Sequence, residues 1–150
     1  MPRYRFQLAS IQKLRESHRD QQRERLAEAV YAQTELTARS EAVANEIAEI
    51  TAKQRAALRS ENIDLNAIID RQRYELLLKA HEKTLLQQAA TLDEETERRR
   101  ATLAAADSEV RVLEKLNDRR QREFKQAEDR KEEQRLSEVA LHQYIRRQLR

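Results

Sequence analysis

The side chains that could bind a metal ion or act as catalysts are scattered along this chain. His18, His81 and His142 are its three histidines, and none lies four residues from another, the spacing at which one helix face holds a metal ion. The chain has no cysteine, so disulfides and zinc–thiolate sites are excluded. No nucleophile is paired with a base. The sequence therefore predicts a protein that is not an enzyme, with no catalytic residues, no metal site and no cofactor.

One dense block of charge could still suggest acid–base chemistry. The acidic residues Asp93, Glu94, Glu95 and Glu97 are followed directly by three arginines, residues 98–100. Paired carboxylates can serve as general acid and base. Acidic and basic residues three or four positions apart on a helix more often form ion pairs on its solvated surface. We interpret the block as such a charged face.

Basic residues gather at both ends of the chain. They are Arg3, Arg5, Lys13, Arg15, Arg19, Arg23 and Arg25 at the start, and Arg146, Arg147 and Arg150 at the finish. Three explanations are open, namely nucleic-acid binding, a solvated helix end, or docking on an acidic protein surface. Glutamates interleave these residues and aromatics make up only 4% of the chain, so few rings are available to stack on bases. We expect no nucleic acid among the partners.

A short apolar run carries a second binding signal. Leu76, Leu77 and Leu78 are consecutive and follow shortly after Tyr74. Three neighbouring leucines cannot all face one helix seam, so at least one, Leu77, is expected to point outward with Tyr74. The run either packs locally or forms a docking patch.

Composition indicates which elements must position these residues. Glycine is absent, the only proline is Pro2, and 38% of the residues are charged. Tight turns, phosphate loops and dinucleotide folds need glycine at positive φ, so sheets and those folds are excluded. No apolar run approaches a membrane span, and the first fifteen residues do not resemble a signal peptide. We expect an all-α, cytoplasmic protein with no direct membrane insertion.

Two heptad patterns predict two long helices. The first, over about residues 5–59, has a clear seam at Leu36, Ser40, Val43, Ile47, Ile50, Gln54 and Ala57. Its upstream part is an interrupted stripe through Leu8, Ile11, Leu14, His18, Gln22, Leu26 and Ala29. The second pattern, over about residues 67–148, keeps heptad spacing from Leu78 through Leu85, Leu92, Leu103, Ala106, Val110 and Phe124 to Ala127. Its seam also contains polar members, at Glu82, Thr96, Arg99, Asn117 and Arg120.

A turn is expected between the helices, at about residues 60–66. Ser60, Asn62, Asp64 and Asn66 are all candidate N-caps for the second helix. A short connection makes long helices antiparallel neighbours, so we predict a single coiled-coil domain, residues 1–150, folded as a hairpin. The alternative is one continuous helix in a parallel dimer. In the hairpin, Ile50 is expected near Leu76, and Leu36 near Ala89 and Ala90.

The second helix is the longer one, so it should overhang. From about Gln126 onward no part of the first helix faces it, and at ~1.5 Å per residue the overhang is ~40 Å long. It still carries Leu141, Ile145 and Leu149 at a spacing that places them on one face. The overhang is therefore expected to meet an external partner.

Both ends of the chain are similar to a known family. Arg5-Phe6-Gln7-Leu8, with Ile11, Leu14 and Arg15, resembles the opening of the flagellar export protein FliJ. Residues 113–120, Glu123-Phe124 and residues 133–140 resemble that family's C-terminal signature, although the family usually has tyrosine at position 124 and aspartate at position 137. The resemblance implies a coiled coil like the rotary ATPase gamma subunit, in a type III export apparatus. Injectisome stalk proteins are close relatives, and a generic coiled-coil dimerisation module is the alternative from another class.

The resemblance also implies partners. These are the export ATPase hexamer, an export-gate membrane protein and export chaperones, so the protein would be associated peripherally with the inner face of the cell membrane. The expected ATPase contacts are Phe6, Leu8, Ile11, Leu141, Ile145, Arg146, Arg147 and Leu149. The expected export-gate contacts are Tyr74 and Leu77.

Overall fold

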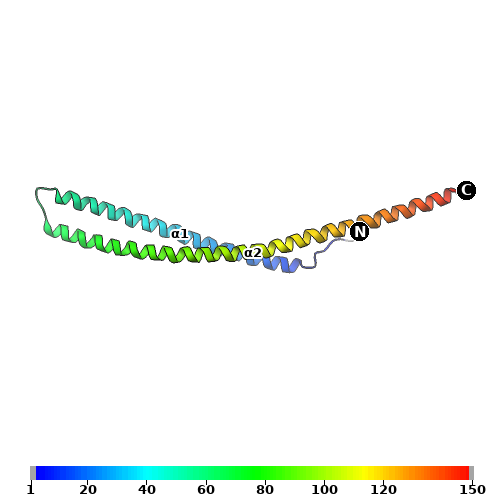
Figure 1. The fold of residues 1–150 in the computed structure, drawn as a ribbon, viewed down its shortest axis with the longest axis horizontal. Coiled ribbons are helices and arrows are strands. Elements are labelled where there is room, and N and C mark those ends of the chain that lie inside the picture. Colours follow the sequence, from blue (N-terminus) through cyan, green and yellow to red (C-terminus); the bar gives the residue numbers. More distant parts are fainter. Residues whose placement is uncertain (1–2, 149–150) are drawn as a thin grey trace. The chain divides into compact units, whose positions relative to one another are not determined.

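Two long helices make up almost all of the structure. The computed structural model describes residues 3–148 and contains α1, Ala9–Leu58, and α2, Leu65–Gln148 (Figure 1). Residues 3–148 contain no strand. The predicted all-α class, with a longer second helix, is confirmed. The first helix begins four residues later than the expected position 5, and residues 3–8 before it are not helical.

The connection between the helices forms without glycine. Asp64 is the N-cap of α2, since its Oδ1 accepts hydrogen bonds from the backbone N–H groups of Asn66 at 3.0 Å and Ala67 at 3.3 Å. The Ser60 hydroxyl lies within hydrogen-bond distance of the carbonyl oxygens of Ala57 and Asn62. No non-glycine residue of the described chain has a positive φ, so the turn needs no left-handed position.

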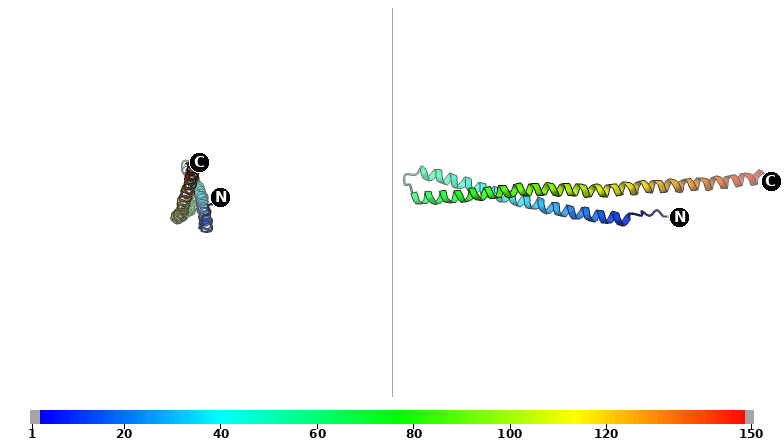
Figure 2. Two further views of the ribbon diagram at one scale, coloured as in Figure 1. Left: turned by 90° about the vertical axis from the view of Figure 1, so that its right-hand side faces the viewer. Right: turned by 60° about the horizontal axis from the view of Figure 1, so that its bottom comes forward.

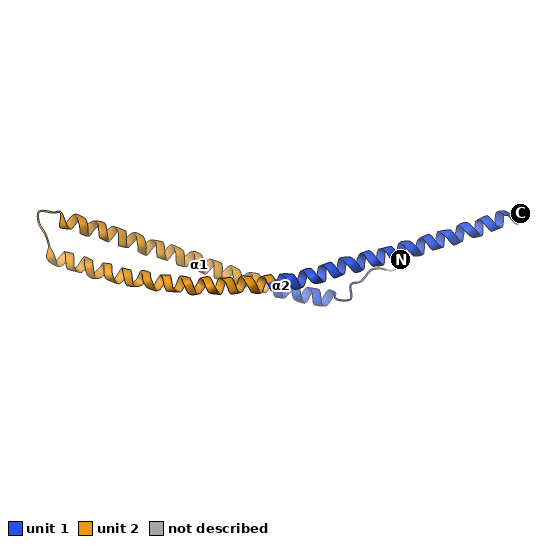
Figure 3. Cartoon of the chain, in the orientation of Figure 1, with its two compact units in different colours: residues 1–20, 105–150 blue, residues 21–104 orange. Residues whose placement is uncertain are grey.

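The described chain divides into two compact units (Figure 3). The hairpin unit consists of Gln21–Ala104 and contains the turn, while the terminal unit consists of residues 1–20 and 105–150. Helix α2 contributes to both units. Within the hairpin unit, α1 and α2 lie side by side and are antiparallel (Figure 2). The expectation of a single coiled-coil domain stays a prediction.

The core of the hairpin unit is the predicted seam. Ala29 and Val43 of α1 and Ile68, Leu78 and Leu85 of α2 are buried. Every expected seam position from Leu36 to Ala57, and from Leu78 to Leu103, is buried or half-buried. In the terminal unit, Ala106 and Val110 are buried. A narrow seam of small and medium side chains therefore takes the place of a globular core.

The predicted upstream stripe of the first helix is confirmed at Gln22, Leu26 and Ala29, which are buried or half-buried, and is wrong from Ile11 to His18. Ile11, Leu14 and His18 are exposed, Leu14 at 68%, and the half-buried positions are instead Gln12, Glu16 and Arg19. The apolar contact at this end comes from Phe6, which is only 8% exposed and precedes the helix. Because that non-helical segment takes the apolar space in the terminal unit, α1 is not required to turn Ile11 and Leu14 inward.

Two further seam details differ from expectation. Leu76 is 67% exposed and does not pack on Ile50, because the observed turn is centred earlier than expected. The Gln54 side chain instead donates to the Ile68 carbonyl at 3.4 Å. Ala127, the last expected seam residue, is exposed because no described part of α1 covers it.

Candidate interaction surfaces

Tyr74 and Leu77 share one face of α2 near the turn. Leu77 is 68% exposed, so its side chain is available to a partner. Tyr74 is also exposed, and its hydroxyl donates a hydrogen bond to the Glu46 carboxylate on α1. That bond, together with partial burial and the nearby negative charge, raises the pKa of Tyr74 above its ordinary value of 10.0. The ring is thus held in place on the surface by α1.

The turn region has more exposed apolar surface than the sequence pattern identified. Leu65, Ile69 and Leu76 are exposed and recur at a spacing that places them on one outer face of α2. Leu58 and Ile63, at either side of the turn, are exposed too. The spacing of the three α2 residues indicates this face only if α2 begins at Leu65, that is, if Asp64 is its N-cap.

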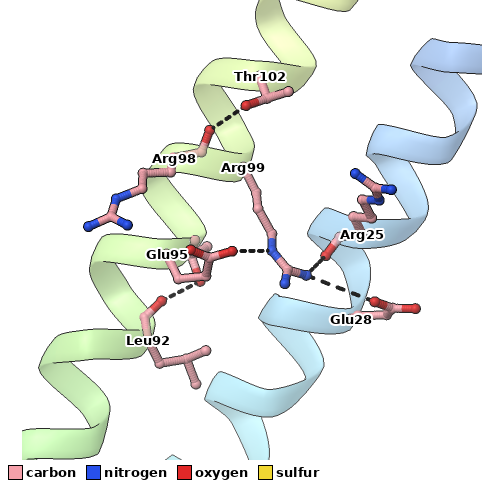
Figure 4. Close-up of polar contacts among 8 residues, drawn as sticks. Arg25, Glu28, Leu92, Glu95, Arg98, Arg99 and Thr102 are labelled. Atoms are coloured by element: carbon pink, nitrogen blue, oxygen red, sulfur yellow. Dashed lines mark hydrogen bonds and ion pairs between the residues drawn. The ribbon is translucent and has the colours of Figure 1, made fainter.

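A polar layer interrupts the apolar seam of the hairpin unit (Figure 4). The Arg99 guanidinium on α2 donates to the carbonyl oxygen of Arg25 on α1 at 2.5 Å and lies 3.9 Å from the Glu28 carboxylate. On its own helix it donates to Glu95 at 2.8 Å. This hydrogen bond lowers the pKa of Glu95 below its ordinary value of 4.5. The Thr96 side chain beside it is buried and donates to the Leu92 carbonyl at 2.8 Å.

This layer is structural in character. Arg99 connects one position of α2 to one position of α1, and polar seam residues of this kind fix the register of coiled coils. Glu95 and the neighbouring acids face arginines at helical spacing, at Arg98–Glu94 and Arg100–Glu97. The charged block of residues 93–100 therefore forms ion pairs, as interpreted from the sequence.

The N-terminal segment, defined here as residues 3–8, packs against α2 within the terminal unit. The Tyr4 hydroxyl donates to Asn117 Oδ1 at 2.8 Å, and the Tyr4 and Phe124 ring centroids are 5.7 Å apart. Arg15, at the start of α1, forms an ion pair with Glu109 at 2.8 Å. Of the expected ATPase contacts at this end, Phe6 is buried, Leu8 is half-buried and Ile11 is exposed.

The end of α2 is uncovered by any described part of the chain. Every residue from Asp129 to Gln148 is exposed, and Figure 2 shows α2 continuing past the N-terminal segment of the same unit. Leu141 and Ile145 are 60% and 45% exposed, share one face with Tyr144, and precede the exposed Arg146 and Arg147. Leu136 and Val139 are exposed on the opposite face. Leu149 and Arg150 lie outside the described residues.

The described residues contain neither a metal-binding cluster nor a membrane-spanning helix. Within residues 3–148, no group of three or more His, Asp or Glu side chains is placed to hold a metal ion. In the same range neither helix combines the length and apolar character that crossing a bilayer requires. The histidines His18, His81 and His142 are all exposed and far apart in the sequence.

The fold defines a class of protein, the all-helical antiparallel coiled coils. The family of flagellar FliJ proteins matches residues 4–149, nearly the whole chain, and the chain belongs to that family. Membership makes it a component of the flagellar protein export machinery and confirms the resemblance at both ends of the sequence. Comparisons with curated proteins and with solved structures found no match.

Proposed function

We propose that this chain is the stalk and adaptor of the flagellar type III export apparatus. In this role it binds the export ATPase hexamer, the export-gate membrane protein and export chaperones, and performs no catalysis itself. It acts at the cytoplasmic face of the membrane through these partners. Membership of the flagellar family supports this system over the injectisome.

The observation that carries the proposal is the uncovered end of α2. Residues 129–148 are all exposed, yet they include Leu136, Val139, Leu141, Tyr144 and Ile145. Scattered exposed leucines are common, but a single helix in water has no need of an apolar stripe followed by two arginines. Burying Leu141 and Ile145 against a partner would contribute on the order of 3–6 kcal/mol before the costs of association.

The ATPase contact in this proposal combines both ends of the chain. Leu141 and Ile145 supply an apolar face, and Arg146 and Arg147 supply positive charge on the other side of the same helical turn. Leu8, Ile11 and the undescribed Leu149 complete the contact. Phe6 is packed inside the terminal unit, so we assign it the task of holding the N-terminal segment in place.

The export-gate contact in this proposal is the patch of Tyr74 and Leu77. Its support is that Leu77 is largely exposed, while the Tyr74 ring is positioned by Glu46. This patch belongs to the hairpin unit and the ATPase contact to the terminal unit, so a variant of one should spare the other.

Two variants test the assignment together. Deletion of residues 137–150 should abolish binding to the purified export ATPase in size-exclusion chromatography while leaving export-gate binding intact. Tyr74→Ala combined with Leu77→Ala should do the reverse, with an unchanged circular dichroism spectrum. Leu86→Ala, an equally exposed leucine of the same helix, is the matched control for the second variant. If each variant weakened both interactions to the same degree, the separation of the two contacts would be wrong.

A further inference from the structure

The terminal unit contains a crevice between the N-terminal segment and α2. It is lined by Arg3, Tyr4 and Arg5 of the segment and by Arg120, Glu123 and Phe124 of α2. The two groups of residues are far apart in the sequence, so the crevice exists only because the segment packs alongside the helix. The guanidinium groups of Arg3, Arg5 and Arg120 therefore line one crevice, although Arg120 is distant from the other two in the sequence.

Tyr4 fixes the shape of this crevice. Its hydroxyl bonds to Asn117 Oδ1 at 2.8 Å and lies 3.3 Å from the Asn117 carbonyl oxygen, while its ring packs on Phe124 at 5.7 Å with the ring planes 50° apart. Arg3 and Arg5 flank Tyr4 in the sequence and are held beside Arg120 by these contacts. The positive charges are thus presented on an ordered backbone, which lowers the entropy lost when a ligand binds.

The positive charge of the crevice is not neutralised from within. Arg3, Arg5 and Arg120 make no hydrogen bond or ion pair in the described part of the chain. The one carboxylate in the lining, Glu123, is engaged by Arg119 at 2.8 Å. Arg120 is half-buried and has no carboxylate partner among the described residues, so its guanidinium is available to an incoming anion.

We infer that this crevice binds an acidic segment of a partner protein, with carboxylates on the three arginines and apolar side chains against Tyr4 and Phe124. Guanidinium groups bind carboxylates through two parallel hydrogen bonds, which gives such a contact both strength and direction. A single-stranded nucleic acid is a poorer fit, because the two rings pack on each other and are not splayed to receive bases. The inference holds whichever protein of the export machinery supplies the segment.

The test measures binding of a fluorescein-labelled peptide of glutamate, leucine and serine to the full chain by fluorescence anisotropy. Arg120→Gln should weaken binding roughly threefold to tenfold. The matched control Arg135→Gln removes the same charge from the exposed end of α2 and should have little effect. Tyr4→Phe changes no charge but releases the segment from Asn117, so it should weaken binding as well.

Four outcomes would overturn the inference. The first is an equal loss with Arg120→Gln and Arg135→Gln, which would indicate non-specific attraction, and the second is equal binding of a peptide with glutamine in place of glutamate. The third is tighter Arg120-dependent binding of a single-stranded oligonucleotide or of inorganic phosphate. The fourth is that the peptide does not bind. Thermal unfolding supplies an independent check. Because Arg120 has no internal counter-charge, Arg120→Gln should not lower the melting temperature, and a clear decrease would show that the residue serves the fold.

Discussion

The Arg99 guanidinium of α2 bonds to the backbone carbonyl oxygen of Arg25 in α1 across the hairpin, at 2.5 Å. The same group also engages Glu95 on its own helix and lies near Glu28 on the other. Apolar seam contacts alone would tolerate a shift of one helix along the other by a heptad. Because α1 has a backbone carbonyl at every residue, the bond to Arg25 could recur after such a shift, whereas the contact with the Glu28 carboxylate depends on a particular side chain of α1. The polar layer therefore favours the observed register of the hairpin unit through its side-chain partner on α1.

Replacing Arg99 should therefore lower stability more than replacing its neighbour. Arg99→Ala removes a cross-helix bond and two charge contacts at a half-buried position, which should reduce the free energy of unfolding by about 1–2 kcal/mol. Arg98→Ala removes only an exposed pair with Glu94 and should reduce it by about 0.5 kcal/mol or less. Urea unfolding followed by circular dichroism measures both. Equal losses in the two variants would remove the special role of Arg99.

The stability contributed by Glu95 should depend on pH in a defined direction. Its hydrogen bond from Arg99 lowers the pKa of the folded carboxyl group below the ordinary 4.5. A carboxyl group whose pKa is lower in the folded state stabilises the protein above the unfolded pKa, and this contribution disappears as the pH falls through the folded pKa. The stability difference between wild type and Glu95→Gln should thus be present near neutral pH and shrink progressively below 4.5. A difference that stayed constant into strong acid would contradict this origin.

The intramolecular hairpin can be tested at a contact that the structure identifies. Gln33 of α1 and Asp93 of α2 are joined by a hydrogen bond of 2.6 Å from the amide Nε2 to the carboxylate Oδ1. Cysteines at these two positions should cross-link within one chain with a short bifunctional reagent, even at low protein concentration. Cysteines at positions 50 and 76 are the control and should react less well, because Leu76 points into solvent. Cross-links formed only between chains would indicate the parallel dimer.

Heptad spacing and capping chemistry predicted the hairpin from sequence because both are local and periodic. The seams from Leu36 to Ala57 and from Leu78 to Phe124 follow from spacing alone, since apolar side chains on one helix face must be covered. Asp64 was one of four candidate caps, and only the geometry of the turn distinguishes it from Ser60, Asn62 and Asn66.

The terminal unit was predicted less well for a physical reason. Tyr4 and Asn117 are 113 residues apart, and a hydrogen bond between a non-helical segment and a distant helix leaves no periodic trace. The interrupted stripe predicted from the spacing of Ile11 and Leu14 is exposed at those two residues, and Phe6 is the buried apolar residue at this end. The candidate contacts Leu141, Ile145, Tyr74 and Leu77 lie on exposed surface, and their partners stay predictions.

The most direct test of the stalk proposal is the stimulation of export ATPase hexamer assembly, followed by ATP hydrolysis at limiting enzyme concentration. Leu141→Ser with Ile145→Ser changes one apolar face at this end of α2, while Leu136→Ser with Val139→Ser makes a matched change on the opposite face, which Arg146 and Arg147 share. The proposal predicts that the first pair loses stimulation, the second pair retains it, and both keep wild-type helicity. Undiminished stimulation by the first pair, or equal loss by both, would contradict the proposal that this face of α2 engages the ATPase.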